Sequence, residues 1–223
     1  EFRRVLFRSF VEFWNNVLAP KFIRFKHILV GGLTKHSEAV FPILPVRKGN
    51  RVLDVGCGFG DTAMKLARLV GPGGEVVGID CCDAFLEIAQ QEAAASGLTN
   101  VRFMRGDAEI ALPKDEFDFV FARFGTMFFA NPVAGLRNMR RALKLGGRMV
   151  HIVWRNRADN PWLSMAKDIV LRFLPQPGAD ALLAHGHDGG VRNGQAERAA
   201  KQRRHREPVG DAADEREIGR AHV

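Results

Sequence analysis

The stretch VLDVGCGFGDT, Val52–Thr62, decides the fold of this chain. A short apolar strand runs into Gly56-x-Gly58-x-Gly60, and a helical pattern begins directly after the loop. Glycine permits a tight turn, or a close approach of the backbone to a ligand that a Cβ would block. A strand, a glycine loop and a helix N-terminus in succession indicate the carboxyl edge of a parallel sheet, where open α/β sheets bind ligands. By itself the loop suits a dinucleotide or only a tight turn.

On both sides of the loop, short apolar strands alternate with amphipathic helices from residue 50 to residue 155. Strands separated by helices of this length imply right-handed crossovers and a sheet covered on both faces. The sequence therefore predicts an α/β fold with a doubly wound, mostly parallel sheet. The predicted strands are 51–56, 75–80, 101–107, 117–124 and 148–155, and the predicted helices are 61–70, 83–97, 131–147 and 160–174.

Residues 10–46 have a different pattern, which predicts an N-terminal helical cap. Apolar residues recur every three or four positions, with Lys and Arg between them. Pro20 and the pair Gly31-Gly32 are the expected helix boundaries, and a second short helix is expected at residues 35–41. The aromatic side chains of this cap could cover a substrate or only pack against the core; they are Trp14, Phe22 and Phe25.

Three consecutive predicted strands end in an acid. Asp54 ends the first, Asp80 the second and Asp107 the third, so all three meet at one edge of the sheet. A carboxylate after the second strand can accept hydrogen bonds from both ribose hydroxyls of an adenosine. A carboxylate after the third strand, with the amide of Ala108, can bind the edge of an adenine. The lining has few cations for phosphate, so it favours an adenosine bearing an amino-acid cation over one bearing a pyrophosphate.

The order and spacing of these motifs resemble a known family. The motifs are DVGCGFG, GIDCCDAFLE, RGDAE, EFDFVFARFGTMFF and LKLGGRMVHIVW, within residues 51–155. Together they look like the successive motifs of class I S-adenosylmethionine-dependent methyltransferases, most like the small-molecule branch with the ubiquinone and menaquinone C-methyltransferases. The resemblance implies a Rossmann-like sheet, S-adenosyl-L-methionine as cofactor, a methyltransferase domain over residues 47–180 and a small-molecule methyl acceptor.

The resemblance also implies roles for single residues. Asp54 and the glycine loop would hold the methionine part, Asp80 the ribose, and Cys81 would pack on the adenine. Asp107 and Ala108 would lie at the adenine edge, and Arg123 and Phe124 beside the methionine end and the transfer site. The expected cofactor-binding set is Asp54, Gly56, Cys57, Gly58, Gly60, Asp80, Cys81, Asp107, Ala108, Arg123 and Phe124.

No catalytic residue is assigned, because methyl transfer from a sulfonium is an in-line displacement that mainly needs alignment and exclusion of water. His151 could act as a base, but its apolar neighbours favour a structural histidine. Arg123 could steer an anionic substrate or pair with an acid at the strand edge. Phe128 and Phe129 could line the acceptor pocket or fill the core, and Trp154 and Trp162 fall near the expected cleft.

Two other classes of protein stay open at this point. A nicotinamide-dependent oxidoreductase also needs a glycine loop and an acid after the second strand, although its usual loop is G-x-G-x-x-G. The second alternative is a non-catalytic module that binds S-adenosylmethionine without transferring the methyl group.

Composition and charge restrict the partners and the location that we expect for the protein. The formal net charge is +8, of which +2 comes from residues 1–9, so a nucleic-acid partner is not expected. No apolar run is long enough to span a bilayer. Cys57, Cys81 and Cys82 form neither a CxxC pair nor a metal set, so we expect reduced thiols, no metal site and a cytoplasmic location. The oligomeric state is not encoded in any of these patterns.

The two ends do not resemble parts of a fold. EFRRVLFRS, residues 1–9, and EIGRAHV, residues 217–223, can be encoded by opposite strands of one DNA that resembles a sequencing adapter. We therefore expect both ends to be artefacts, the chain to be a fragment, and the last strands of the family sheet to be missing. Residues 181–216 lack apolar periodicity, which predicts a disordered tail, either read in a shifted frame or genuinely basic.

Overall fold

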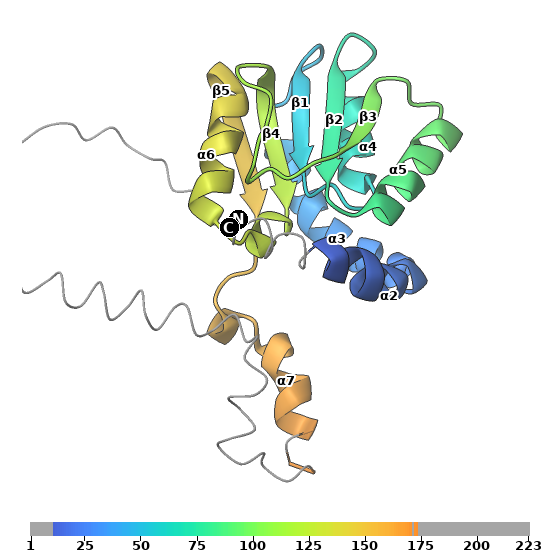
Figure 1. Ribbon diagram of the computed structural model, residues 1–223, viewed down its shortest axis with the longest axis vertical. Coiled ribbons are helices and arrows are strands. Elements are labelled where there is room, and N and C mark those ends of the chain that lie inside the picture. The colour runs from blue at the N-terminus through green and yellow to red at the C-terminus, as the bar shows by residue number, and fades with distance from the viewer. Residues whose placement is uncertain (1–10, 171, 174–223) are drawn as a thin grey trace, which may run out of the picture. The chain divides into compact units, whose positions relative to one another are not determined.

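The computed structural model describes residues 11–170 and 172–173. The chain divides into two units between Asn160 and Pro161. The first unit contains one sheet with its helices, and the described part of the second contains α7 (Pro161–Val170), where a helix was predicted (Figure 1). The predicted tail and both adapter-like ends lie outside the described residues. Within the described ranges, no helix is long and apolar enough to cross a membrane.

The sheet has the strand order β3-β2-β1-β4-β5, and each neighbouring pair of strands is parallel. The first strand therefore lies at the centre, and the chain winds outward to one side and then to the other (Figure 1). This is the doubly wound arrangement predicted from the alternation of strands and helices. The strands are β1 (Arg51–Val55), β2 (Glu75–Asp80), β3 (Val101–Arg105), β4 (Phe117–Arg123) and β5 (Leu143–Ile152).

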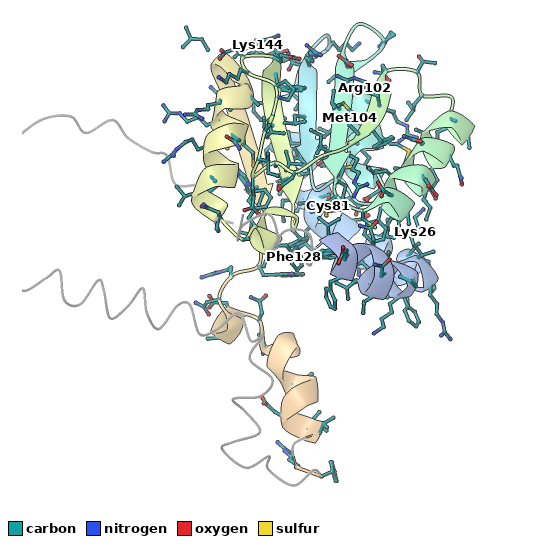
Figure 2. The ribbon with its side chains drawn as sticks, viewed as in Figure 1. Lys26, Cys81, Arg102, Met104, Phe128 and Lys144 are labelled. Carbon is teal, nitrogen blue, oxygen red and sulfur yellow. The ribbon has the colours of Figure 1, made fainter. Side chains whose placement is uncertain are left out.

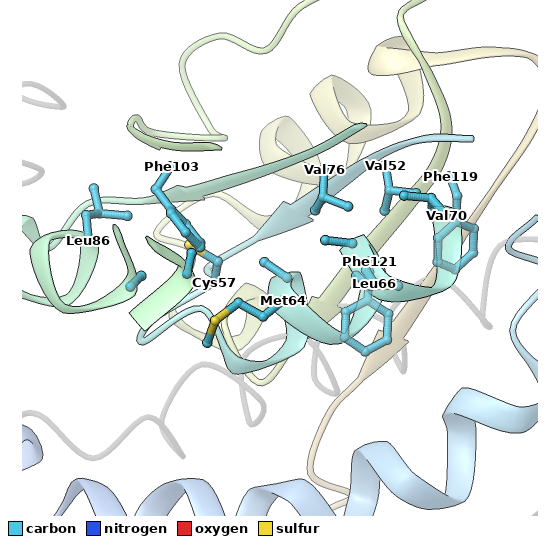
Figure 3. Packing of buried hydrophobic residues seen from close by; sticks show 14 residues of the cluster. Val52, Cys57, Met64, Leu66, Val70, Val76, Leu86, Phe103, Phe119 and Phe121 are labelled. Carbon is cyan, nitrogen blue, oxygen red and sulfur yellow. The ribbon is translucent and has the colours of Figure 1, made fainter. Parts of the chain in front are cut away.

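Helices cover both faces of the sheet. Successive residues of a strand point to opposite faces, so Val52 belongs to the core cluster that includes residues of α4 and α5, whereas Leu53 belongs to a second cluster that includes residues of α6. Both side chains are fully buried, as expected of a parallel sheet covered on both sides. Figure 3 shows the first of these two core clusters, with Phe103 and Phe119 among its members. The helices are α4 (Asp61–Val70), α5 (Asp83–Ala95) and α6 (Pro132–Ala142).

The N-terminal segment is helical, but one predicted boundary is wrong. Pro20 lies in the first turn of a helix as predicted, whereas Gly31 and Gly32 lie inside a continuous helix. Two glycines cost such a helix about 1 kcal/mol each relative to alanine. The helix contacts the core on both sides of the glycine pair, since Val30 packs against a core cluster and Ser37 is fully buried. The helices are η1 (Trp14–Leu18), α2 (Ala19–Arg24), α3 (Lys26–Val40) and η2 (Phe41–Ile43).

The helix predicted for residues 131–147 is too long. The structure ends α6 at Ala142, and Leu143 already pairs with Phe117 of β4. Regular pairing resumes only at Arg148, so residues 144–147 bulge out of the strand. Gly146 has a φ of +82°, which no residue of a right-handed helix can adopt. The buried pairing of Leu143 thus overrides the helical pattern. No strand follows β5 in the described residues.

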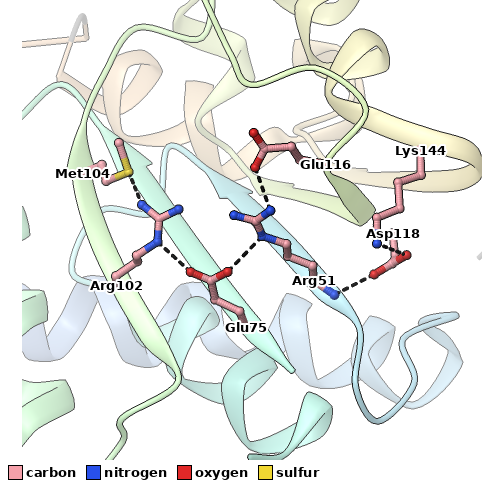
Figure 4. Close-up of polar contacts among 7 residues, drawn as sticks. All are labelled: Arg51, Glu75, Arg102, Met104, Glu116, Asp118 and Lys144. Atoms are coloured by element: carbon pink, nitrogen blue, oxygen red, sulfur yellow. Dashed lines mark hydrogen bonds and ion pairs between the residues drawn. The ribbon is translucent and has the colours of Figure 1, made fainter. Parts of the chain in front are cut away.

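Charged side chains join the strands at the amino edge of the sheet (Figure 4). Arg51 forms ion pairs with Glu75 at 2.9 Å and with Glu116 at 2.7 Å, and Arg102 pairs with Glu75 at 2.7 Å. The hydrogen bond from Arg102 is the main cause of the lowered pKa of Glu75. These side chains are about one-third exposed or more, so each pair contributes at most about 1 kcal/mol. The charged groups at the amino edge are therefore bound to one another, and we assign this edge a structural role.

We expect the change Gly135→Ala in α6 to destabilise the protein. Alanine ordinarily favours a helix by about 1 kcal/mol over glycine. Here the added Cβ would lie 2.4 Å from the ring of Phe129, which must then move. We expect the free energy of unfolding in urea to fall by about 1–3 kcal/mol. A variant more stable than the wild type would show that this contact does not constrain the helix.

Candidate functional site

A cavity of about 200 Å³ lies at the carboxyl edge of the sheet. The loops after β1, β2, β3 and β4 line one side of the cavity, and the helices η1, α2 and α3 line another. In Figure 2, Cys81 and Phe128 lie toward the N-terminal helices, whereas Lys144 and Arg102 lie at the opposite edge. The predicted site residues that line the cavity are Gly56, Cys57, Gly58, Asp80, Cys81, Asp107, Ala108, Arg123 and Phe124. Asp54 and Gly60 lie behind this lining.

The three loop glycines have different functions, although all have positive φ. At Gly56 (φ +68°) an added Cβ would lie 2.9 Å from the Cα of Gly125, so two backbones meet there. At Gly60 (φ +76°) the Cβ would lie 2.7 Å from the ring of Phe103. At Gly58 (φ +54°) the Cβ would meet nothing within 4 Å. Gly56 and Gly60 are therefore required for packing, whereas Gly58 leaves space open at the cavity lining.

Asp80, at the end of the neighbouring strand β2, is hydrogen-bonded to the glycine loop. Its Oδ2 accepts a hydrogen bond from the backbone N–H of Gly58 at 2.8 Å, and its Oδ1 accepts one from Cys82 at 3.0 Å. Burial raises the pKa of this carboxyl group, although both backbone donors oppose that shift. The side chain remains part of the cavity lining. A carboxylate fixed by two backbone groups is thus presented to any ligand beside the glycine loop.

The loop after β3 contributes two more acids. Asp107 accepts a hydrogen bond from the backbone N–H of Glu109 at 2.8 Å, and burial raises its pKa. The Glu109 carboxylate accepts hydrogen bonds from the backbone N–H groups of Ala130 at 2.7 Å and Asn131 at 2.6 Å. These bonds hold the loop after β3 against the start of α6. Both acids line the cavity.

Asp54 lies beneath the loop and is fully buried. Its Oδ2 accepts a hydrogen bond from the Thr62 hydroxyl at 2.6 Å, and its Oδ1 has no hydrogen-bond partner in the described structure. Burial raises the pKa of the carboxyl group to about 7, although the hydrogen bond from Thr62 and the charge of Arg123 oppose the shift. The structure therefore places a carboxyl group that changes charge near neutral pH under the glycine loop.

Arg123 pairs with an acid, one of the two alternatives left open by the sequence. Its guanidinium donates two hydrogen bonds to Asp61, at 2.8 and 2.7 Å, and a third to the hydroxyl of Ser37 at 3.0 Å. The side chain is only 8% exposed, so this bidentate pair is largely shielded from water. It joins the end of β4, the first turn of α4 and the cap helix α3.

Phe124 has a backbone conformation that is unusual for a non-glycine residue. Its φ is +59°, and its ring stacks on Trp154 with centroids 4.3 Å apart. The His36 ring meets both rings edge-on, at 5.5 and 5.1 Å. Strained residues of this kind persist where packing over-determines them, often at functional sites. Phe124 lies in the cavity lining.

Aromatic side chains line the part of the cavity next to the N-terminal helices. Trp14 meets Phe22, Phe85 and Phe128 edge-on or nearly so, with ring centroids 5.1 to 6.4 Å apart. All four side chains line the cavity, as does Phe129. Phe25, the third aromatic residue suggested as a cover, is instead 46% exposed and does not line the cavity. The cap therefore supplies an aromatic wall through Trp14 and Phe22.

His151 does not line the cavity. It is half-buried beside the sulfur of Met149 at 3.2 Å, and burial lowers its pKa, which fits a structural histidine. The side chain of Trp162 lies outside the described residues. Burial raises the pKa of all three thiols, that of Cys81 to about 12, and they are not in disulfides. The described residues contain no group of three or more potential metal ligands.

Several residues of the site were not predicted from the sequence. Asp61 follows the glycine loop directly, but nothing local indicates that its partner lies 62 residues away. The cap residues Leu29, Val30 and Leu33 look like ordinary core residues until the fold brings them to the cavity. Of these site residues, only Glu109 could have been found from the sequence, since it lies two residues after Asp107, which was predicted to end a strand.

The buried Asp54 carboxyl group should make stability depend on pH. Its pKa is raised from 3.8 to about 7 on folding, so between these values the folded state holds a proton that the unfolded state has lost. The free energy of unfolding of the wild type should therefore fall, relative to that of Asp54→Asn, as the pH rises from 3.8 to about 7. We expect a total difference on the order of 2–4 kcal/mol in urea titrations. A difference that does not change with pH would contradict this.

Comparisons with known proteins agree with this geometry. A family model described as "Methyltransferase domain" matches residues 46–171. The ubiquinone/menaquinone biosynthesis C-methyltransferase of Pseudomonas putida is 35% identical over 165 residues, which cover 72% of this chain and 64% of the relative. The demethylmenaquinone methyltransferase of Geobacillus kaustophilus is 39% identical over 117 residues, covering 52% of this chain and 50% of the relative. The chain thus spans less than two thirds of the length of these relatives.

Solved structures show the same relationship. A SAM-dependent methyltransferase from Aquifex aeolicus has a TM-score of 0.50 and 29% identity, covering 53% of this chain and 63% of its own. A putative methyltransferase from Bacillus halodurans has a TM-score of 0.50 and 26% identity, covering 60% and 57%. Because the family match covers more than half of the chain, the chain belongs to the methyltransferase domain family and, within it, to the class I S-adenosylmethionine-dependent methyltransferases.

Proposed function

We propose that the protein transfers a methyl group from S-adenosyl-L-methionine to a small-molecule acceptor bound in the same cavity. The observation that carries the proposal is the fixed carboxylate of Asp80 beside the open lining at Gly58. The adenosine ribose would bind at Asp80, and the adenine would lie between Cys81 and the loop of Asp107 and Ala108. The methionine part would lie along the glycine loop, toward Phe124.

The charges of the lining support this cofactor over a dinucleotide. Asp80, Asp107 and Glu109 provide carboxylates that suit ribose hydroxyls, an adenine amine and a cationic amino acid. Among the residues that line the cavity, Arg123 is the only lysine or arginine, and Asp61 already binds it through two hydrogen bonds. A pyrophosphate would face these acids without a cation available to it. The nicotinamide alternative therefore has no support in the lining.

The chemistry needs little beyond positioning. When bound, the cofactor supplies a methyl group on a sulfonium, whose leaving thioether is neutral. The protein has to align the acceptor with that methyl group and exclude water. The Arg123–Asp61 pair fixes the end of β4 where Phe124 lines the cavity, and the aromatic wall from the cap shields the site. We assign no base, since one is needed only if the acceptor must lose a proton.

We further propose that the acceptor is flat and largely apolar. The part of the cavity next to the cap is lined by Trp14, Phe22, Phe85 and Phe128, which suit a ring better than a charged group. The names of the Pseudomonas and Geobacillus relatives point to quinone biosynthesis. Three thiols outside any disulfide support a reducing, cytoplasmic setting as part of the same proposal.

Asp80 provides the first test of the cofactor site. In calorimetric titrations with S-adenosylhomocysteine, we expect Asp80→Asn to weaken binding about tenfold to a hundredfold, because the amide provides a weaker acceptor for ribose hydroxyls. Asp83→Asn is the matched control, since Asp83 follows the same strand but does not line the cavity. NADH should bind neither protein. Equal affinities of Asp80→Asn and wild type would contradict the assigned site.

Gly58 provides a steric test. The change Gly58→Ala places a methyl group in the open space of the lining, so we expect S-adenosylhomocysteine affinity to fall at least about tenfold. Gly49→Ala is the matched control: Gly49 also has positive φ (+82°) and open surroundings, but it does not line the cavity. Both variants should lose a similar stability, about 1–2 kcal/mol from backbone strain. Equal ligand affinity in the two variants would exclude Gly58 from the binding surface.

A further inference from the structure

The N-terminal helices have an outer face that combines apolar and cationic side chains. Large apolar residues that would normally be buried are exposed there, from 38% for Ile23 to 61% for Ile28. Single exposed apolar residues are ordinary, but several within sixteen residues form a surface that calls for a partner. We define this outer face by Phe13, Val17, Ile23, Phe25 and Ile28 together with the exposed cations Lys21 and Arg24.

The charge of this segment restricts the partner. No Asp or Glu occurs between Asn15 and His36, whereas four Lys and Arg do. One of the four, Lys26, is paired with Glu92 of α5, and Arg24 lies over the ring of Phe25 at 5.4 Å. A second copy of the chain would bring this cationic face against itself, which costs free energy. An anionic surface with an apolar interior would satisfy both kinds of side chain.

We propose that the outer face docks the chain on an anionic lipid surface. Amphipathic helices of this composition lie in the headgroup region, with aromatic and aliphatic side chains inserted and cations at the phosphates. Each exposed cation adds to the attraction of an anionic leaflet, and that attraction is screened by salt. The face therefore suits phospholipid headgroups above an acyl layer, whereas free phosphate would leave the apolar side chains exposed to water.

Hydrogen bonds join the N-terminal helices to the core beside the cavity, so docking of these helices would bring the cavity close to the lipid. The Asn15 side chain donates a hydrogen bond to the carbonyl of Cys81 at 3.2 Å and accepts one from the N–H of Asp83 at 3.0 Å. The same helices that form the outer face line the cavity through Phe22 and Val30. A docked chain would thus hold its acceptor pocket next to the lipid, a consequence that rests on the proposed function.

The test uses the full chain and vesicle flotation, with and without salt. One set of vesicles is phosphatidylcholine alone, and the other is an equimolar mixture with phosphatidylglycerol. We expect binding to the mixed vesicles, little binding to phosphatidylcholine, and a loss of binding at high salt. Phe25→Ser/Ile28→Ser and Lys21→Glu/Arg24→Glu should each lower the partition coefficient at least about tenfold.

Matched controls separate docking from other causes. Val133→Ser/Leu145→Ser removes two exposed apolar side chains of α6 and β5, and Arg137→Glu/Arg140→Glu reverses two cations of α6; both should bind lipid like the wild type. S-adenosylhomocysteine affinity should be unchanged in all four variants, which shows that they are folded and keeps this test separate from the proposed function. Wild-type protein that ignores mixed vesicles, or outer-face variants that bind like the wild type, would overturn the proposal.

Discussion

The parallel alignment of β1 with β2 and β4 is the constraint on which the rest of the structure depends. Because the three strands run in one direction, their carboxyl ends bring the glycine loop, Asp80 and Arg123 to one edge. The backbones of Gly56 and Gly125 then meet so closely that neither position can carry a side chain without displacement. The cavity follows from this convergence, and the N-terminal helices cover what the sheet edge leaves open.

Three acidic residues lie under and around the glycine loop, and each has different surroundings. Asp54 is buried without a cation in hydrogen-bonding contact, so burial dominates and its pKa is raised. Asp61, the first residue of α4, is bound by Arg123 through two hydrogen bonds. Asp80 accepts two backbone N–H groups and still lines the cavity. The three neighbouring acids thus differ in environment: Asp54 lies behind the lining, Asp61 lines the cavity but is bound by Arg123, and Asp80 lines it while fixed by backbone donors.

The sequence predicted most of the fold because its signals there are local. β2 and α4 have the predicted bounds, since a short apolar run and a glycine loop mark them within a few positions. The errors occurred where distant contacts override local pattern: Gly31 and Gly32 lie inside a packed helix, and Leu143 joins the sheet. The same contrast between local signals and distant contacts applies to the site. Strand-end acids were predicted, whereas the partner of Arg123 and the aromatic wall depend on contacts between segments far apart in sequence.

A crystal structure of the chain with S-adenosylhomocysteine would show whether this cavity binds the cofactor. We expect the nucleoside in the cavity at the carboxyl edge, with its ribose hydroxyls on Asp80 and its homocysteine along Gly56 and Gly58. Ligand density elsewhere on the chain, or a ribose that does not contact Asp80, would contradict the assignment of this cavity as the cofactor site.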